Sequence, residues 1–241
     1  MQRSAQDFAR EDRRGRKLRI GIFGGTFDPI HLGHVIAAEM IRDCFRIDRM
    51  YIIPAALPPH KHRPDIISPH HRLAMVKLAV TGNPKFVPSD LEIVRRGNSY
   101  TIETVEHFRS EGDLFLIMGH DSFSIFETWK RYEDILAMCR IVLPIRPGFD
   151  PIDWACYGAA ITGYHDEGRI IDVHWDQENL ELERTDWKIA LVGIPGLDVS
   201  STEIRTRIAS GRSVRYLVHD SVAGYIDTHG IYRRPGVNGS T

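Results

Sequence analysis

The feature that most constrains the fold is a series of short, almost wholly apolar runs. They occupy residues 18–23 (LRIGIF), 50–53 (MYII), 114–118 (LFLIM), 141–145 (IVLPI) and 189–194 (IALVGI). Runs of this length, bounded by glycine, proline or polar residues, are typical of strands that are buried on both faces. Burial on both faces is a property of parallel sheets covered by helices, so the runs predict an α/β protein.

Segments of helical periodicity separate these runs. Apolar residues recur every three or four positions in residues 32–45 and 69–80, and residues 101–109 predict a shorter helix. Because alternating strands and helices form βαβ units, we expect a single Rossmann-like, doubly wound and mostly parallel sheet. Residues 86–93 are expected to add a strand. Residues 149–187 are the least periodic and are expected to be an excursion from the sheet.

The chain is expected to fold as one domain. Neither an internal repeat nor a low-complexity linker divides its 241 residues. Residues 1–17 carry six basic and three acidic residues and no apolar segment, which predicts a disordered tail rather than a secretory signal. The folded domain is then expected over residues 18–241.

Charge and composition narrow the classes of partner. The 31 Lys and Arg residues nearly balance the 32 Asp and Glu residues, and the net charge of −1 lacks the basic field of a non-specific nucleic-acid binder. No apolar stretch approaches the ~20 residues of a membrane span. We therefore expect no nucleic-acid partner and no membrane association. Whether the protein forms a homo-oligomer stays an open question at this point. Cys44, Cys139 and Cys156 lack metal-type spacing and predict reduced thiols in a cytoplasmic protein.

A glycine- and histidine-rich loop follows the first apolar run. Residues 24–34 read GGTFDPIHLGH. In doubly wound sheets ligands bind beyond the carboxyl ends of the strands, and two glycines there let a ligand approach the backbone closely. Asp28-Pro29 turns the chain into the next helix, whose start places His31 and His34 on one side. Imidazoles beside a helix N-terminus favour phosphate, and we expect them to be protonated near neutral pH.

Other interpretations of this loop stay open on the residues alone. Paired glycines after a strand often form only a tight turn. A His-x-x-His pair is sometimes a metal site, although no acidic or thiol partner accompanies it here. The loop has neither the GxxxxGK[ST] pattern of a P-loop nor the GxGxxG pattern of a dehydrogenase, although Asp48 stands about where a dehydrogenase has its ribose-binding acid.

A second phosphate-type motif, residues 199–207 (VSSTEIRTR), follows the last apolar run. Ser200 and Glu203 predict a capping box at the start of a helix that ends near Gly211. Capping does not account for Thr202 and Arg205. The free backbone N–H groups of this helix start, with Arg205 one turn on, predict a cradle for pyrophosphate.

These motifs resemble a known superfamily. GTFDPxHxGH is similar to the signature of the adenylyltransferases among the HxGH nucleotidyltransferases, and residues 199–205 resemble their ISSTxIR motif, with Val199 replacing the usual Ile. The resemblance implies ATP bound across the first loop, with its β and γ phosphates at the second motif. It implies that His34, His31 and Arg205 are catalytic. The residues that it implies for ATP binding are Gly24, Gly25, Thr26, Phe27, Asp28, His31, Gly33, His34, Gly119, Asp121, Ser200, Ser201, Thr202 and Arg205.

Further segments resemble the nicotinate mononucleotide adenylyltransferases. They are IIPAALPPHK (52–61), SYTIET (99–104), GHDSF (119–123), ETW (127–129), IRPG (145–148) and YIDTHGIY (225–232). Together they extend the resemblance over residues 20–232. The residues that it implies for nicotinate mononucleotide are Lys61, Tyr100, Thr101, Asp121, Trp129 and Arg146. Where the family commonly has Asn after IIP, this chain has Ala55, so no role is assigned there.

The chemistry of these residues suits such a substrate. Trp129 offers an aromatic face to a pyridine ring, although a tryptophan is often simply part of the core. Backbone N–H groups near Thr101 and Trp129 suit a carboxylate, Asp121 suits ribose hydroxyls, and Arg146 suits a phosphate. Four histidines, His60, His62, His70 and His71, are expected on the surface.

The resemblance implies adenylyl transfer from ATP to nicotinate mononucleotide, giving deamido-NAD and pyrophosphate in NAD biosynthesis. The attacking phosphate oxygen is already anionic, so an in-line displacement needs alignment and charge neutralisation rather than a base. Mg²⁺ is expected on the ATP oxygens and not in a carboxylate cage of the protein. The alternatives are the same chemistry on nicotinamide mononucleotide or phosphopantetheine, and a module that senses a nucleotide without converting it.

Overall fold

A seven-stranded parallel sheet organises the chain. The computed structural model describes residues 15–58, 65–146, 152–175, 184–196 and 198–233. Within them the strands run in the order β3-β2-β1-β4-β5-β7-β6, and all six neighbouring pairs are parallel. The strands are β1 (Arg19–Gly25), β2 (Arg49–Pro54), β3 (Phe86–Pro88), β4 (Asp113–Ile117), β5 (Cys139–Ile145), β6 (Ile170–His174) and β7 (Ile189–Gly193). The prediction of a doubly wound α/β sheet is confirmed.

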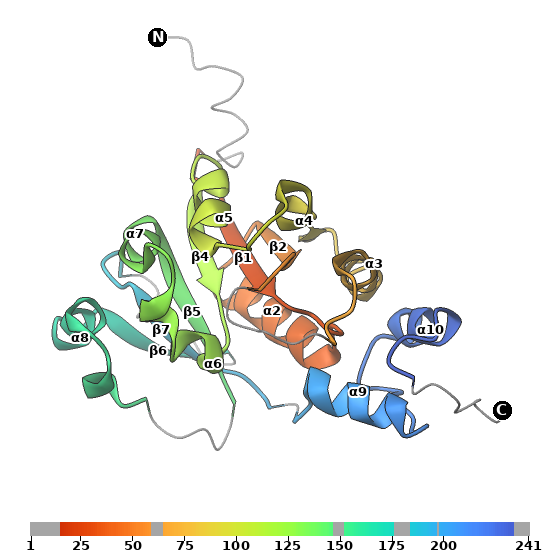
Figure 1. The fold of residues 1–241 in the computed structure, drawn as a ribbon. Helices are drawn as coiled ribbons and strands as arrows, with labels where there is room; N and C mark the ends of the chain where they lie inside the picture. The colour runs from red at the N-terminus through yellow and green to blue at the C-terminus, as the bar shows by residue number, and fades with distance from the viewer. Residues whose placement is uncertain (1–14, 59–64, 147–151, 176–183, 197, 234–241) are drawn as a thin grey trace, which may run out of the picture.

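Helices cover both faces of this sheet (Figure 1). The α-helices are α2 (Leu32–Cys44), α3 (Pro69–Ala79), α4 (Leu91–Arg95), α5 (Thr101–Phe108), α6 (His120–Phe123), α7 (Tyr132–Met138), α8 (Ala159–Asp166), α9 (Ser201–Ala209) and α10 (Asp220–Thr228). Short 3-10 helices span Phe126–Thr128 (η1) and Trp154–Cys156 (η2). One hydrophobic core lies under α2, α3, α9 and α10, and a second lies under α5, α6, α7 and α8.

Alternation along the central strands explains the two cores. In β4, Leu114 and Leu116 enter one core, whereas Phe115 and Ile117 enter the other. Successive side chains of a strand point to opposite faces, so a run that is apolar at every position needs helices on both sides. The apolar runs therefore encode the layered architecture directly.

Two expectations about secondary structure were wrong. The strand expected over residues 86–93 ends at Pro88, and Leu91–Arg95 forms the helix α4 instead. Ser89 accepts a hydrogen bond from the amide of Leu91, which turns the chain into that helix. Residues 149–187 are not simply an excursion, because they contain β6, the edge strand beside β7. Its burial alternates, so Ile171 and Val173 are its fully buried residues, and this pattern is too short to stand out in the sequence.

The start of the described chain is tied to the sheet. The guanidinium of Arg16 donates to both carboxylate oxygens of Asp48 at 3.0 and 3.1 Å, and Asp48 also accepts from the amide of Arg19. Of the predicted tail 1–17, residues 1–14 lie outside the described residues. Asp48 directly precedes β2 and thus lies at the amino ends of the strands, far from where a dehydrogenase binds ribose.

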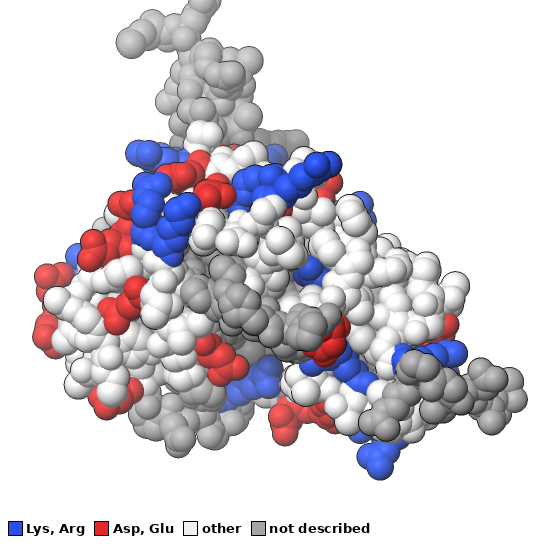
Figure 2. Space-filling view, viewed as in Figure 1, with Lys and Arg blue, Asp and Glu red and all other residues white. Residues whose placement is uncertain are grey.

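The surface of the protein carries mixed charges, as the balanced composition predicts. On the face seen in Figure 2, Lys and Arg side chains are interspersed with Asp and Glu rather than gathered in one field. Among the described residues, no helix combines the length and apolar character needed to cross a membrane.

The strand order fixes where a ligand binds. The chain moves outward from β1 to β2 and β3, then returns to the other side of β1 to form β4. In doubly wound sheets the crevice at this reversal, beyond the carboxyl ends of the strands, is the ligand site. The loops after β1 and β4 meet at that point, because Phe23 is in register with Ile117.

Candidate active site

The loop after β1 is held rigidly by its own side chains. Phe27 has a φ of 47°, and its buried ring packs edge-on against Phe23 and His34, with centroids 5.5 and 5.1 Å away. A Cβ on Gly25 would lie 2.9 Å from the Phe27 ring, whereas a Cβ on Gly24 would meet nothing within 4 Å. Gly25 is therefore required by packing, and Gly24 leaves open space at the end of the strand. Phe27, expected at ATP, is buried, and its ring packs within the loop.

His31 and His34 form a stacked pair at the start of α2. His31 is the N-cap, and its backbone N–H donates to Nδ1 of His34 at 3.3 Å. The two rings stack with centroids 3.6 Å apart and an interplanar angle of 28°. A Cβ on Gly33 would lie 3.1 Å from the His31 ring, so Gly33 makes room for the pair. The expectation that the two imidazoles share one side of the helix is confirmed.

The burial of His31 favours its neutral form and opposes the imidazolium that a neighbouring phosphate is expected to favour. Its side chain is only 3% exposed, and burial, with a smaller contribution from the positive charge of Arg146, lowers its pKa from 6.5 to about 4. Burial disfavours the charged form of a histidine. The spacing of the motif places the ring but gives no information on its burial, which explains the error.

We expect this neutral histidine to make the fold sensitive to mild acid. The folded pKa lies below the unfolded one, so the unfolded chain binds the proton first and the His31 contribution is lost as pH falls below 6.5. Between pH 7 and pH 5 the free energy of unfolding of the wild type should fall by about 2 kcal/mol more than that of His31→Asn. Urea unfolding at the two pH values measures this difference. If the free energy of unfolding fell equally in the two proteins between pH 7 and pH 5, the depressed pKa of His31 would be contradicted.

The second motif lies directly against the first. Ser200 caps α9 by accepting from the amide of Glu203 at 3.1 Å, as predicted. In a full capping box the Glu203 carboxylate would accept a hydrogen bond from the backbone N–H of Ser200. It instead lies 3.4 Å from Arg207 and forms an ion pair along the helix. The hydroxyl of Ser201 donates to the carbonyl of Pro29 at 2.9 Å, which joins α9 to the loop after β1.

Arg205 is the main link between the two motifs. Its Nη1 donates to the backbone carbonyl of Asp28 at 2.7 Å and lies 3.8 Å from the carboxylate, while Nη2 donates to the Thr202 hydroxyl. Asp28 is buried and also accepts from the hydroxyl of Tyr232 at 2.7 Å. Burial, followed by the Asp28 carboxylate, raises the pKa of Tyr232, which keeps the phenol protonated. The sequence assigned Arg205, Thr202 and Asp28 to one predicted site, and it included Tyr232 in a family-like segment without giving that residue a role.

A cavity of about 240 Å³ opens at the reversal of the sheet order. Its walls include seven of the predicted site residues: Gly24, Gly25, Thr26, Tyr100, Thr101, Asp121 and Trp129. The other expected side chains that the structure describes lie outside the cavity wall, and those of the two phosphate motifs cluster around α2 and α9. Lys61 lies outside the described residues. Arg146 is exposed and near enough to His31 to affect its pKa.

Trp129 serves both the core and the cavity. It directly follows η1, three residues before α7, and its ring packs edge-on against Phe126 at 5.4 Å. The residue is half-buried and its remaining surface lines the cavity. Thr101 lines the same cavity from the first turn of α5, where helix N–H groups have no partner within the helix.

Several cavity residues escaped sequence reasoning. Polar members are Glu92, Ser99, Thr104, Ser122 and Lys130. Glu92 is 7% exposed and accepts from the Thr104 hydroxyl at 2.8 Å, and Ser99 accepts from the amide of Ala56 at 2.8 Å. Ser99, Thr104 and Ser122 lie in segments that the resemblance singled out, but no role was assigned to them, and Lys130 directly follows the predicted Trp129. Glu92 joins the cavity only through tertiary contacts, which no local pattern indicates.

No protein-made metal cage is present in the described ranges, where no group of three or more His, Cys, Asp or Glu side chains is placed to hold an ion. The carboxylate nearest the two phosphate motifs, that of Asp28, is engaged by Tyr232 and Arg205. The site is therefore built from backbone amides, imidazoles and a guanidinium, which suit an anionic ligand.

Similar proteins share this architecture. Residues 22–207 match the family described as cytidylyltransferase-like. A protein of Thermoanaerobacter sp. named "Probable nicotinate-nucleotide adenylyltransferase" is 36% identical over 228 residues, which cover 93% of this chain and 99% of the relative. A Pseudomonas fluorescens protein of the same name is 40% identical over 223 residues, covering 90% and 98%.

A solved structure gives the same result for the fold. Plasmodium falciparum nicotinic acid mononucleotide adenylyltransferase, complexed with NaAD, matches with a TM-score of 0.64 at 18% identity, over 89% of this chain and 97% of that one. The family match and the curated relatives each cover most of the chain. It therefore belongs to the cytidylyltransferase-like family and, within that family, to the nicotinate-nucleotide adenylyltransferases.

Proposed function

We propose that this protein transfers the adenylyl group of ATP to the phosphate of nicotinate mononucleotide, which gives deamido-NAD and pyrophosphate for NAD biosynthesis. The observation that carries the proposal is the union of the two phosphate motifs by Arg205 and Ser201, beside a cavity with an aromatic wall. Family membership supplies the acceptor class. A triphosphate lies across the motifs, and a mononucleotide occupies the cavity.

Each group has a role in an in-line displacement. The phosphate oxygen of the mononucleotide attacks the α-phosphorus of ATP, and the bond to the pyrophosphate oxygen breaks. His34 and His31 contact the α and β phosphates, Arg205 and the N-terminus of α9 hold the leaving pyrophosphate, and Arg146 holds the acceptor phosphate. No proton has to be removed from the attacking oxygen, so alignment and charge neutralisation suffice.

The His31 amide donates to Nδ1 of His34, so Nδ1 faces its own helix start. This contact leaves Nε2 as the ring nitrogen that donates a hydrogen bond to a phosphate oxygen. Mg²⁺ binds with ATP through its phosphate oxygens and supplies further charge neutralisation. Cys44, Cys139 and Cys156 are thiols and not members of disulfides, which supports a reducing, cytoplasmic location.

Pyrophosphate release from Mg-ATP tests the function. The protein is incubated with ATP and, in turn, nicotinate mononucleotide, nicotinamide mononucleotide, phosphopantetheine or no acceptor. The highest kcat/KM is expected with nicotinate mononucleotide. A higher value for either other acceptor would reassign the substrate. ATP binding without turnover in any mixture would instead identify a nucleotide sensor.

We expect Trp129→Ala to raise the KM for nicotinate mononucleotide about tenfold and the KM for ATP less than twofold. An aromatic stack contributes ~0.5–1.5 kcal/mol beyond burial, and the truncated wall also exposes the ring to water. Steady-state kinetics with each substrate varied in turn measure the split. Trp154→Ala is the matched control, because Trp154 packs against the same core but does not line the cavity. Equal rises in both KM values would show that Trp129 is only a core residue.

A further inference from the structure

The cavity wall carries more acidic than basic side chains, which is unfavourable for a ligand with a carboxylate. Of the nineteen described residues that line it, Glu92 and Asp121 are acidic and Lys130 is the only Lys or Arg. Glu92 is buried and close enough to Arg72 to affect its pKa, whereas Asp121 is exposed. A carboxylate that enters the cavity therefore has one cationic side chain of the wall with which to pair.

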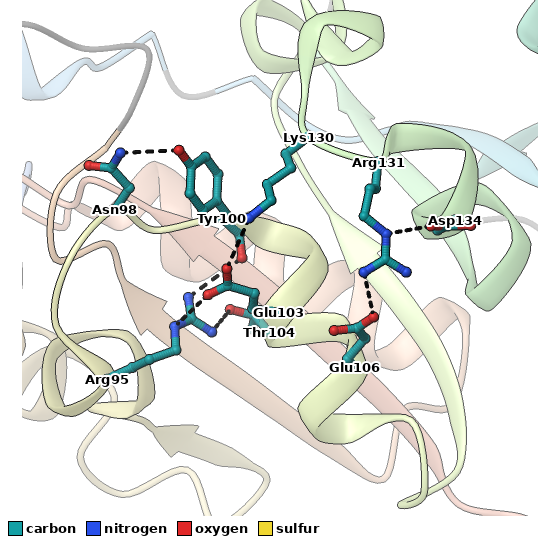
Figure 3. Close-up of polar contacts among 9 residues, drawn as sticks. All are labelled: Arg95, Asn98, Tyr100, Glu103, Thr104, Glu106, Lys130, Arg131 and Asp134. Atoms are coloured by element: carbon teal, nitrogen blue, oxygen red, sulfur yellow. Dashed lines mark hydrogen bonds and ion pairs between the residues drawn. The ribbon is translucent and has the colours of Figure 1, made fainter.

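The Lys130 side chain lies over the N-terminal end of α5. Its Nζ lies 4.2 Å from the centroid of the Tyr100 ring and 3.5 Å from Oε1 of Glu103 (Figure 3). Tyr100 is the N-cap of α5, and its hydroxyl accepts from the side-chain amide of Asn98 at 3.2 Å. The ammonium and the positive end of the helix dipole thus lie on the same side of the cavity.

Glu103 allows Lys130 to change partner. The second carboxylate oxygen of Glu103 lies 3.1 Å from Nε of Arg95, so the carboxylate stays paired when the ammonium leaves it. The Lys130 side chain is 50% exposed, and an exposed ion pair contributes little stability. Moving Nζ from Glu103 to a ligand carboxylate therefore costs little.

Trp129, Lys130 and Thr101, the first residue of α5, line the same cavity. A pyridine ring that stacks on Trp129 therefore has the Lys130 ammonium and the start of α5 among its neighbours. We propose that Lys130 is a specificity-determining residue, which favours the carboxylate of nicotinate mononucleotide over the neutral carboxamide of nicotinamide mononucleotide. This inference rests on the proposed function, and it adds the residue that discriminates between the two acceptors.

The test compares the two mononucleotides, which differ only in this group. Lys130→Met should lower kcat/KM for nicotinate mononucleotide roughly tenfold, the low end for a charge-assisted hydrogen bond because Lys130 is half exposed. The value for nicotinamide mononucleotide should change less than twofold, and the KM for ATP should not change. Lys130→Arg, which keeps the charge, should restore most of the preference.

Arg131→Met is the matched control. This variant also removes one positive charge. The Arg131 side chain, however, points away from the cavity and pairs with Asp134 and Glu106, at 2.6 and 2.8 Å (Figure 3). It should leave the ratio of the two kcat/KM values unchanged. An equal loss for both mononucleotides in Lys130→Met, or no loss for either, would overturn the inference. A wild type that converts neither mononucleotide would overturn the proposed function itself, which is a different result.

Discussion

Replacing His34 with alanine is expected to lower kcat about 10²–10³-fold, by analogy with the loss of one oxyanion-hole donor, while the KM for ATP rises only a few-fold. The ring is aligned by its stack on His31 and by the hydrogen bond to Nδ1. Its interaction with phosphate strengthens only as charge shifts toward the leaving pyrophosphate. An interaction made mainly in the transition state affects kcat rather than ground-state binding.

ATP binding should survive this change because, in the proposed mechanism, other groups also hold the triphosphate. Arg205 and the N-termini of α2 and α9 are unchanged in this variant. His70→Ala is a suitable control, because His70 is an exposed histidine near the start of another helix, α3. Steady-state and single-turnover kinetics measure the effect. If ATP affinity collapsed while kcat survived, His34 would be a binding residue and the assigned role would be wrong.

Local patterns predicted the two motifs of the candidate site because each motif is a few residues at one strand–helix junction. There, glycine spacing and helix starts determine the local backbone geometry. The apolar runs predicted the central strands in the same way, because a strand that is buried on both faces is apolar at nearly every position. The ends of α2, α3 and α5 accordingly lie within about one residue of the predicted ranges.

The sequence failed where a property depends on tertiary burial. Nothing near His31 indicates that its ring is enclosed, so its neutral state was missed. The contact between Asp28 and Tyr232 spans 204 positions, and no local signal joins them. The edge strand β6 buries only alternate residues, so it lacks the continuous apolar run that identified the central strands. These errors share one cause: a residue's own neighbours in the chain do not report what packs against it from elsewhere.

Arg72 is the clearest example of such a residue. It lies on α3 and is 0% exposed, although a charged helix residue is ordinarily read as solvated. Its guanidinium donates to the carbonyl of Thr26 at 2.7 Å, to that of Ile67 at 3.1 Å and to that of Ala56 at 3.2 Å. Burial lowers its pKa, and the nearby carboxylates of Asp28 and Glu92 partly oppose that effect. One side chain thus joins the loops after β1 and β2 beneath the site.

We expect Arg72→Met to lower the free energy of unfolding by about 3–5 kcal/mol. The change leaves three backbone carbonyls without this donor and two acidic groups with less positive charge nearby, and unpaired buried groups are costly. For a chain of this size the melting temperature should fall by roughly 10 °C, which thermal unfolding measures. Lys77→Met is the matched control, because Lys77 is exposed on the same helix, and it should shift the melting temperature by less than about 2 °C.

A second variant separates charge from geometry. Arg72→Lys keeps the positive charge but cannot reach three carbonyls at once, so its stability should fall between those of the wild type and Arg72→Met. Because Arg72 holds Thr26, which belongs to the loop proposed to bind ATP, the KM for ATP should rise in the same order as stability falls. A melting temperature of Arg72→Met equal to that of the control would show that the three hydrogen bonds contribute no net stability. The link from α3 to both loops would then be geometric only, and the stability of the loop after β1 would rest on its contacts with Arg205, Ser201 and Tyr232.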